Sequence, residues 1–174
     1  MRLCKQMSAR KSNVYVLDGE YGIGFTTNTN RKFFFDKEDY ERIKGYCWYE
    51  NSVGYIITTV KRKCILLHRL IMDVVDTTYP IIDHINNDKL DNRKANLRLA
   101  DKKQNGINRS YNRNNKLGVK GVYFSKREKK YRAHISKDRH HMDLGGYDNI
   151  EDAIRARRKK EVELFGEYAY CQST

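Results

Sequence analysis

A carboxylate and an imidazole stand side by side at the end of an apolar run, in the stretch IIDHINNDKL. They are Asp83 and His84, and asparagines follow at positions 86, 87, 92, 96 and 105 with no cysteine nearby. A carboxylate and an asparagine carbonyl are hard oxygen ligands suited to Mg²⁺, which usually keeps several waters and completes its shell with phosphate oxygens. This pattern favours metal-dependent hydrolysis of a phosphodiester bond.

The expected chemistry divides among three side chains. Asp83 and Asn105 would hold one Mg²⁺ or Mn²⁺ ion per site, which leaves His84 as the general base, because an imidazole accepts a proton near neutral pH. Adjacent residues of a strand point to opposite faces, so Asp83 and His84 can serve different tasks. Asp–His pairs also arise by chance and asparagine-rich loops are ordinary turns, so the rest of the chain has to support the site.

The net charge restricts the class of partner. The 174 residues include 35 Lys and Arg against 22 Asp and Glu, a formal charge of +13. This charge fits a polyanion such as double-stranded DNA better than a neutral small-molecule substrate. No run approaches the roughly 20 apolar residues of a membrane-spanning helix, the start lacks a secretory signal, and the four cysteines are too scattered for a zinc site or a disulfide framework. We therefore expect a cytoplasmic protein of a bacterial or phage-infected cell, bound to no membrane.

Two short strands and a helix would position the proposed site. The apolar stretch from residue 81 ends at the Asp–His pair, a polar loop follows to residue 95, and residues 97–100 read as a second strand. A helix is predicted from Asp101, because Asp101 and Gln104 form a capping-box pattern. Asn105 and Asn108 would share a face of that helix. The expected unit is a β-hairpin followed by a helix whose Asn105 faces the Asp–His strand.

The upstream part of the chain alternates strand-like runs with turn signals. Residues 1–12 are basic and without periodicity, and we expect a mobile arm there. The runs VYVLDG, YGIGFTT, KFFFD, YIITTV and CILLHRL read as strands. A short helix is predicted in DKEDYERIKGYCWYE, with Asp36 as N-cap and Asp39 completing a capping box. Three aromatic residues at its end either fill a small core or stack on a base: Tyr46, Trp48 and Tyr49.

The stretch DHINNDKLDNRKANLRLADKKQN resembles the HNH, or ββα-metal, endonucleases, in particular the phage and intron-encoded homing enzymes. The likeness covers about residues 67–108 and rests on LHR, DH, the asparagine-rich loop, NL and the helical asparagine, in the family's order and spacing. It implies that Asp83 and Asn105 hold the metal and that His84 is the general base. It further implies that Asn96 ties the loop to the strand that carries the histidine.

The upstream LHR motif leaves two roles open. His68 either bridges strands through a hydrogen bond or lies at the edge of the active site as a further catalytic group. Arg69 is expected to contact a phosphate. A basic run then follows between residues 102 and 127, without an acidic residue, and it is either a solvated linker or a segment that tracks the DNA backbone. Its basic residues are Lys102, Lys103, Arg109, Arg113, Lys116, Lys120, Lys126 and Arg127.

The C-terminal part reads as a second module. GVYFS, YRAHIS and HHMDLGG predict three strands, and a helix is predicted over residues 150–165, where Arg157 and Glu161 interrupt the apolar stripe as an i,i+4 pair. GVY, YRAHI, LGGYD and EDAIRA resemble the APETALA or ethylene-response type of DNA-binding domain, whose sheet lies in the major groove. Three residues depart from that family: Asp143 replaces a tryptophan and Ser125 and Ser136 replace arginines. The base specificity of the family therefore does not transfer.

Alternation of residues assigns the two faces of the predicted three-stranded sheet. The face toward the helix would carry Val122, Phe124, Ala133, Ile135, Met142 and Leu144. The open face, which is either a DNA-reading surface or merely solvated, would carry Tyr123, Ser125, Arg132, His134, Ser136, His141 and Asp143. Lys126, Arg127 and Lys137 are expected to contact phosphates.

These observations predict an α+β protein with four segments: a mobile arm (1–12), an HNH nuclease domain (13–110), a basic linker (111–117) and an APETALA-type DNA-binding domain (118–170). The predicted function is sequence-directed, metal-dependent DNA cleavage by a homing or other mobile-element endonuclease, acting as a monomer or weak dimer. A non-catalytic DNA-binding regulator derived from a nuclease and an RNA-binding protein are the alternatives. The candidate DNA contacts are Arg69, Lys102, Asn108, Arg109, Arg113, Lys116, Lys120, Tyr123, Ser125, Lys126, Arg127, Arg132, His134, Ser136 and His141.

Overall fold

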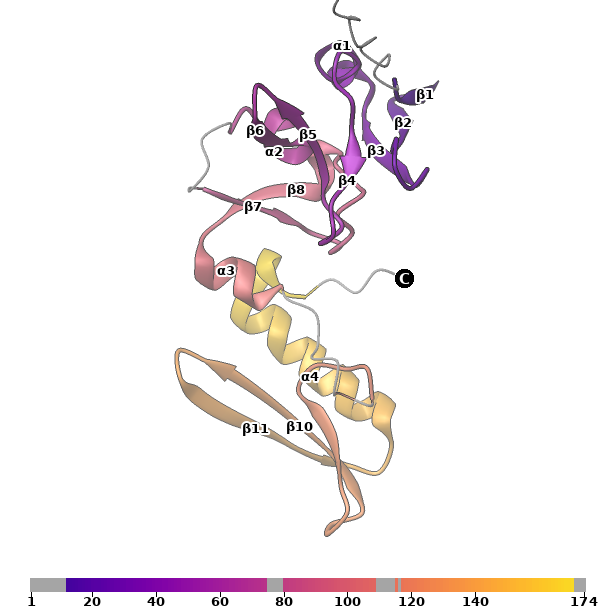
Figure 1. The fold of residues 1–174 in the computed structure, drawn as a ribbon. Coiled ribbons are helices and arrows are strands. Elements are labelled where there is room, and N and C mark those ends of the chain that lie inside the picture. The colour runs from indigo at the N-terminus through magenta and orange to yellow at the C-terminus, as the bar shows by residue number, and fades with distance from the viewer. Residues whose placement is uncertain (1–11, 75–79, 109–114, 116, 171–174) are drawn as a thin grey trace, which may run out of the picture. The chain divides into compact units, whose positions relative to one another are not determined.

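The computed structural model describes residues 12–74, 80–108, 115 and 117–170. Small antiparallel sheets and a few helices confirm the predicted α+β class. The chain divides into two compact units, Met1–Ala100 and Asp101–Thr174, whose elements are labelled in Figure 1. Among the described residues, no helix is both long and apolar enough to cross a membrane. The predicted arm, apart from its last residue, and most of the predicted linker lie outside the described residues.

The first unit begins with an antiparallel meander of β1 (Val14–Asp18), β2 (Tyr21–Phe25) and β3 (Lys32–Asp36). Gly22 and Gly24 of β2 lie opposite Phe35 and Phe33 of β3. A Cβ added at either glycine would lie within 2.3 Å of the facing phenylalanine ring. The two glycines therefore let both rings fold back across β2 and enter the core.

A second sheet holds β4 (Tyr49–Glu50), β5 (Ile56–Val60) and β6 (Lys63–Leu66), all antiparallel. The prediction that CILLHRL forms one strand is wrong, because β6 ends at Leu66 and the helix α2 (Leu67–Ile71) begins directly after it. Leu67, His68 and Ile71 are the buried residues of α2. That spacing places them on one helical face, so burial of this face against the core overrides the local strand preference.

The predicted capping box at residues 36–39 is also wrong. A 3-10 turn, η1 (Lys37–Asp39), leads into α1 (Tyr40–Ile43), and the Asp36 side chain makes no cap hydrogen bond. Instead, Asp36 Oδ2 accepts a hydrogen bond from the Lys94 backbone N–H at 2.7 Å. The buried Asp39 carboxylate forms ion pairs with Arg42 and Lys94. Both carboxylates thus bind Lys94, a distant residue of the chain, and Asp39 also pairs with Arg42 of α1.

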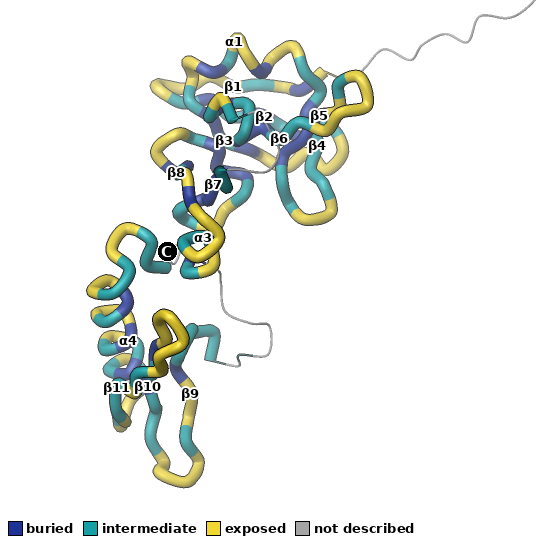
Figure 2. The backbone as a smooth tube through the Cα atoms, turned by 90° about the vertical axis from the view of Figure 1, so that its left-hand side faces the viewer, coloured by how far each residue is buried: buried dark blue, intermediate teal, exposed yellow. Residues whose placement is uncertain are grey.

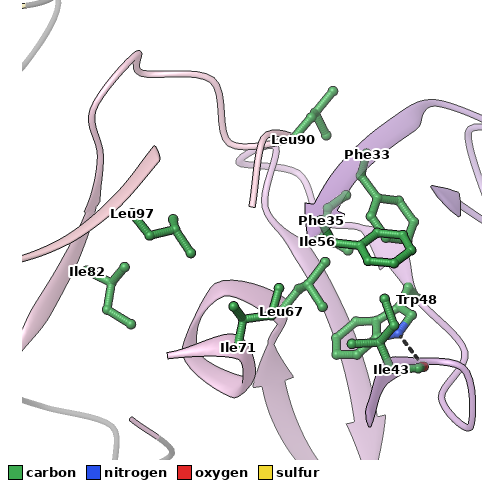
Figure 3. Close-up of a cluster of buried hydrophobic side chains, with 10 residues drawn as sticks. All are labelled: Phe33, Phe35, Ile43, Trp48, Ile56, Leu67, Ile71, Ile82, Leu90 and Leu97. Carbon is green, nitrogen blue, oxygen red and sulfur yellow. Dashed lines mark hydrogen bonds between the residues drawn. The ribbon is translucent and has the colours of Figure 1, made fainter. Parts of the chain in front are cut away.

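The core of the first unit gathers buried side chains from β3, α1, β5 and α2 and from the segment that follows them, as Figure 3 shows. Trp48 is fully buried there, and its Nε1 donates to the Ile43 carbonyl at 2.9 Å, so it fills the core and offers no ring to a base. Ile82 and Leu97 come from β7 (Ile81–His84) and β8 (Leu97–Ala100) and point toward the side chains of α2. Each such buried aliphatic side chain contributes on the order of 2 kcal/mol. The hairpin predicted to carry the Asp–His pair is therefore anchored directly on α2.

The second unit holds α3 (Lys102–Ile107) and a three-stranded antiparallel sheet with a helix beside it. The sheet consists of β9 (Val122–Ser125), β10 (Lys130–Lys137) and β11 (His140–Tyr147), and α4 (Ile150–Phe165) is followed by η3 (Gly166–Tyr168). Its small core includes Val122, Ala133 and Ala153, and the buried positions are dark blue in Figure 2. The three strands and the helix occur where the sequence predicts them.

Two details of this sheet and helix decide which side chains are exposed. Phe124 was expected to face α4, but it is 45% exposed and packs edge-on against Tyr131 at 5.0 Å between ring centroids. Phe124 lies near the end of β9. The alternation of residues along the strand therefore predicted more burial for its side chain than the structure shows. Arg157 and Glu161 form the expected i,i+4 ion pair, with 2.9 Å between Nη1 and Oε2, and both are buried. This pair lets two charged residues lie within the helix face that packs on the sheet.

Candidate active site

The hairpin β7–β8 places the Asp–His pair. Its strands are antiparallel, and Asp83 lies directly opposite Arg98. The Nε and Nη2 atoms of Arg98 donate to Asp83 Oδ2 at 3.0 and 2.7 Å. Opposite residues in an antiparallel pair share a face, so the strand register itself creates this ion pair. Because both side chains are largely buried, Arg98 fixes the orientation of the carboxylate and offsets the cost of burying its charge.

His84, the last residue of β7, is 5% exposed. This burial lowers the pKa of its imidazole, while the Asn92 side chain and the nearby carboxylates, first among them Asp83, act in the opposite direction. The net shift is downward from 6.5, so His84 is neutral at physiological pH. A neutral imidazole is the form that can accept a proton.

Two further rings surround His84. The His68 ring of α2 lies 5.1 Å from the His84 ring, nearly perpendicular to it, and the Tyr55 ring lies 5.4 Å from His68 and 6.1 Å from His84. Burial lowers the pKa of His68 to about 3, and the neighbouring His84 and Arg69 add to this shift. Burial also raises the pKa of the Tyr55 hydroxyl, and the Asp83 charge adds to the rise. The three rings are therefore uncharged together at neutral pH.

Sequence reasoning missed Tyr55 and left the role of His68 open. The structure places His68 on a helix, beside the Asp–His pair, and not as a bridge between strands. Tyr55 precedes β5 and looks in the sequence like one more aromatic residue at the start of a strand. Only the packing of α2 between β5 and the β7–β8 hairpin brings these rings together.

Asn96 holds the loop that follows β7. Its Nδ2 donates to Asn86 Oδ1 at 2.9 Å and to the Asp91 carbonyl at 2.8 Å. Its Oδ1 accepts from the Asn86 backbone N–H at 3.0 Å, and its own carbonyl accepts from the Ile85 N–H at 2.9 Å. These bonds join the two ends of the loop directly beyond His84. Buried hydrogen bonds of this kind order a loop that has few apolar contacts.

The same loop is also joined to β3, a link that the sequence gave no means to foresee. The Phe34 N–H donates to the Leu90 carbonyl and the Asn92 N–H to the Phe34 carbonyl, both at 2.8 Å. Asn92 is fully buried, and the neighbouring Asp91 receives two hydrogen bonds from the Arg93 guanidinium, each 2.7 Å long. Burial alone would raise the Asp91 pKa, but these bonds outweigh it and hold the pKa below 3.8. The N-terminal sheet therefore serves as a support for the loop.

Asn105, the other predicted metal ligand, lies on α3, in the second compact unit. The predicted capping box begins this helix: the Gln104 N–H donates to Asp101 Oδ1 at 2.7 Å, and the Asp101 N–H donates to Gln104 Oε1 at 2.8 Å. Among the described residues, no group of three or more His, Cys, Asp and Glu side chains is arranged to hold a metal. Arg98 orients the Asp83 carboxylate, and carboxylate and amide oxygens are hard donors of the kind that Mg²⁺ prefers.

The predicted DNA contacts differ in their placement. Arg69 Nη1 donates to the Pro80 carbonyl at 3.3 Å, and Lys120 Nζ donates to the Ile107 carbonyl at the end of α3 at 2.8 Å. Asn108 is the C-cap of α3 and is 1% exposed. Lys102, Lys126 and Arg127 are exposed, whereas the predictions for Arg109, Arg113 and Lys116 fall outside the described residues.

The open face of the β9–β11 sheet carries a row of rings. The centroids of Tyr123 and His134 are 5.8 Å apart, and those of His134 and His141 are 5.0 Å apart. Ser136 Oγ lies 3.2 Å from His141 Nδ1, and Ser125 lies at the end of β9. The arginine of this face, Arg132, forms ion pairs with Glu128 and Asp143, which offset its positive charge. This face thus offers aromatic surface and little net positive charge.

Comparison with known proteins finds a protein family and a viral protein that resemble this chain. Residues 79–107 match the family described as HNH endonuclease. The matched segment runs from just before β7 through α3 and includes Asp83, His84, Asn96 and Asn105. The chain is also 28% identical over 170 residues to a protein of Acanthamoeba polyphaga mimivirus described as uncharacterized HNH endonuclease L560. The aligned residues make up 95% of this chain and 88% of the viral protein. No solved structure matches the chain. The family match points to a nuclease.

Proposed function

We propose that this protein is a metal-dependent DNA endonuclease that hydrolyses phosphodiester bonds. The observation that carries the proposal is the buried His84 beside an Arg98-oriented Asp83, both within the segment that matches the HNH family. Burial also lowers the pKa of His84, which favours its neutral form. An imidazole in this state accepts the proton of an attacking water, which is the step a phosphodiesterase needs from a general base.

The remaining residues of the site have supporting roles in this proposal. Asp83 and Asn105 would hold one divalent cation, Mg²⁺ or Mn²⁺, which stabilises negative charge at the scissile phosphate when bound. Asn96 keeps the loop beyond His84 closed through its hydrogen bonds to Asn86. Metal affinity is expected to rise when DNA is bound, because phosphate oxygens complete the ligand set.

The proposed domains are a nuclease domain over residues 13–110, a linker over 111–117 and a DNA reader over 118–170. We assign α3 to the nuclease domain because the family match runs to residue 107, although the helix packs within the second compact unit. The reader would recognise double-stranded DNA through the ring-bearing face of its sheet, with Lys126 and Arg127 on phosphates. Homing or another mobile-element activity, by a monomer or weak dimer, is the biological role we propose.

Cleavage of supercoiled plasmid tests the proposed function. The plasmid carries the DNA that flanks the gene, and the reactions contain Mg²⁺, Mn²⁺ or EDTA. We expect nicked or linear product with either metal, no product with EDTA, and a loss on the order of 10²- to 10⁴-fold with His84→Ala. His140→Ala is the matched control, because His140 is an exposed histidine of β11. Tight, salt-sensitive binding without metal-dependent cleavage would refute the nuclease and favour a DNA-binding regulator.

A further inference from the structure

The Tyr55 ring lies 6.1 Å from the His84 ring, although Tyr55 is outside the segment that matches the family. Its backbone N–H donates to Asn51 Oδ1 and its carbonyl accepts from the Asn51 N–H, both at 2.9 Å. Gly54 precedes it with a φ of +92°, a conformation that favours glycine in this turn. The backbone at Tyr55 is thus held by a short, internally bonded turn before β5.

The loop beyond His84 is joined to this turn by a lysine. Lys89 Nζ lies 4.5 Å from the centroid of the Tyr55 ring and donates to the Val53 carbonyl at 2.8 Å. A cation over an aromatic face is attracted to the ring electrons. Tyr55 therefore contacts two parts of the site, the imidazole of His84 and the loop that follows it.

The backbone of His84 is held on both sides, by the pairing of β7 with β8 and by the Asn87 N–H, which donates to the His84 carbonyl at 2.9 Å. The orientation of its imidazole is set by the side chains around it. Asn92 forms a hydrogen bond with it, and His68 and Tyr55 provide two ring contacts. A catalytic group has to be held to within about 0.5 Å and 10–20° of its productive geometry.

We propose that Tyr55 is a positioning residue of the catalytic centre, whose ring holds the His84 imidazole in its productive orientation. This inference rests on the proposed nuclease function. The ring, and not the hydroxyl, carries the role, because the contact with His84 is a ring-to-ring contact. Tyr55→Phe should therefore preserve activity, and replacement by a non-aromatic residue should reduce kcat without weakening DNA binding.

The experiment compares Tyr55→Leu, Tyr55→Met and Tyr55→Phe with the wild type in single-turnover cleavage and in DNA binding with Ca²⁺ in place of Mg²⁺. Tyr46→Leu is the matched control, because Tyr46 packs on Trp48 in the same unit, with ring centroids 5.6 Å apart. A misplacement of about 1 Å costs on the order of 100-fold in rate. We expect Tyr55→Leu and Tyr55→Met to lose about 10- to 100-fold in kcat per folded molecule, with DNA affinity within about twofold of wild type.

The outcomes separate this role from the proposed function. Retained activity in Tyr55→Phe together with a loss in the Leu or Met variant, beyond that of Tyr46→Leu, would support the positioning role. An active wild type whose Tyr55→Leu and Tyr55→Met variants keep the kcat of Tyr46→Leu would overturn the role alone. If Tyr55→Leu does not fold, Tyr55→Met decides, because its flexible side chain fills a similar space. A wild-type protein without metal-dependent cleavage would overturn the proposed function, and the positioning role with it.

Discussion

At the scale of single residues, His68 should make the stability of the protein depend on pH. Its folded-state pKa of about 3 lies below the ordinary 6.5, so between these values the unfolded chain binds a proton that the folded chain excludes. The free energy of unfolding therefore falls as the pH drops through this window, by at most about 1.4 kcal/mol per pH unit from this group. In His68→Asn, the slope of the free energy of unfolding against pH should become smaller, by an amount equivalent to the binding of up to about one proton.

Urea denaturation at several pH values between 4 and 7.5 measures this slope. His84 acts in the same direction, since its pKa is also lowered, and it remains in the variant, so part of the pH dependence should persist. His140→Asn is the control at an exposed position and should keep the wild-type slope. Identical slopes for wild type and His68→Asn would show that the folded protein accepts a proton on His68.

The residues of the site were only partly accessible from the sequence. Asp83, His84, Asn96 and Asn105 could be singled out because their types and spacing form a local pattern. Arg98 and Tyr55 could not, since their roles depend on strand register and on the packing of α2. For Asp36 the local pattern was misleading. The sequence predicted that its carboxylate caps a helix, but in the structure the carboxylate accepts a hydrogen bond from the distant Lys94 N–H.

At the scale of elements, the close approach of β2 and β3 makes Gly24 hard to replace. An added Cβ would lie 2.2 Å from Phe33 Cζ, and Phe33 is fully buried in the core. Gly24→Ala should therefore lower the free energy of unfolding by about 1–3 kcal/mol, as overpacking does. Gly45→Ala is the matched control, because no atom lies within 4 Å of its added Cβ, and it should change stability by less than about 1 kcal/mol.

Denaturant unfolding followed by tryptophan fluorescence checks this comparison, because Trp48 lies in the same core as Phe33. Equal stabilities of the two alanine variants would mean that the Phe33 ring moves aside at little cost. The 85–96 loop is hydrogen-bonded to Phe34 of β3. Gly24→Ala, which disturbs β3, should therefore also lower the rate of DNA cleavage more than Gly45→Ala does.

The elements that the sequence predicted well are those with strong local signals. β7 and β8 follow from two short strand-like runs, the start of α3 from its capping box, and α4 from an apolar stripe. α2 was mistaken for a strand because a short apolar run does not distinguish the two periodicities. The link between the 85–96 loop and β3 pairs segments far apart in the sequence, which no local pattern encodes.

At the scale of the whole molecule, the net charge is +13. We expect DNA affinity to depend on where the basic residues lie and not on the net charge alone. The turn between β9 and β10 carries Lys126 and Arg127, both exposed, and Arg127 forms only a long ion pair of 3.6 Å with Glu128. Arg132, on the open face of the sheet, pairs more closely with two carboxylates, those of Glu128 and Asp143. Phosphate contacts by the reader should therefore come from the turn. Base contacts would fall to the row of rings beside it, which carries no fixed charge.

A double variant, Lys126→Ala with Arg127→Ala, tests this division of roles. Losing two phosphate contacts should reduce the slope of log Kd against log salt by about two and weaken binding to every DNA sequence alike. The rate of cleavage at saturating DNA should stay at the wild-type level, because neither residue belongs to the proposed active site. The control, Arg155→Ala with Lys159→Ala, removes the same charge from exposed positions of α4. Equal losses of affinity in both double variants would mean that net charge alone drives binding, and the reader surface would then have to be sought elsewhere in the second unit.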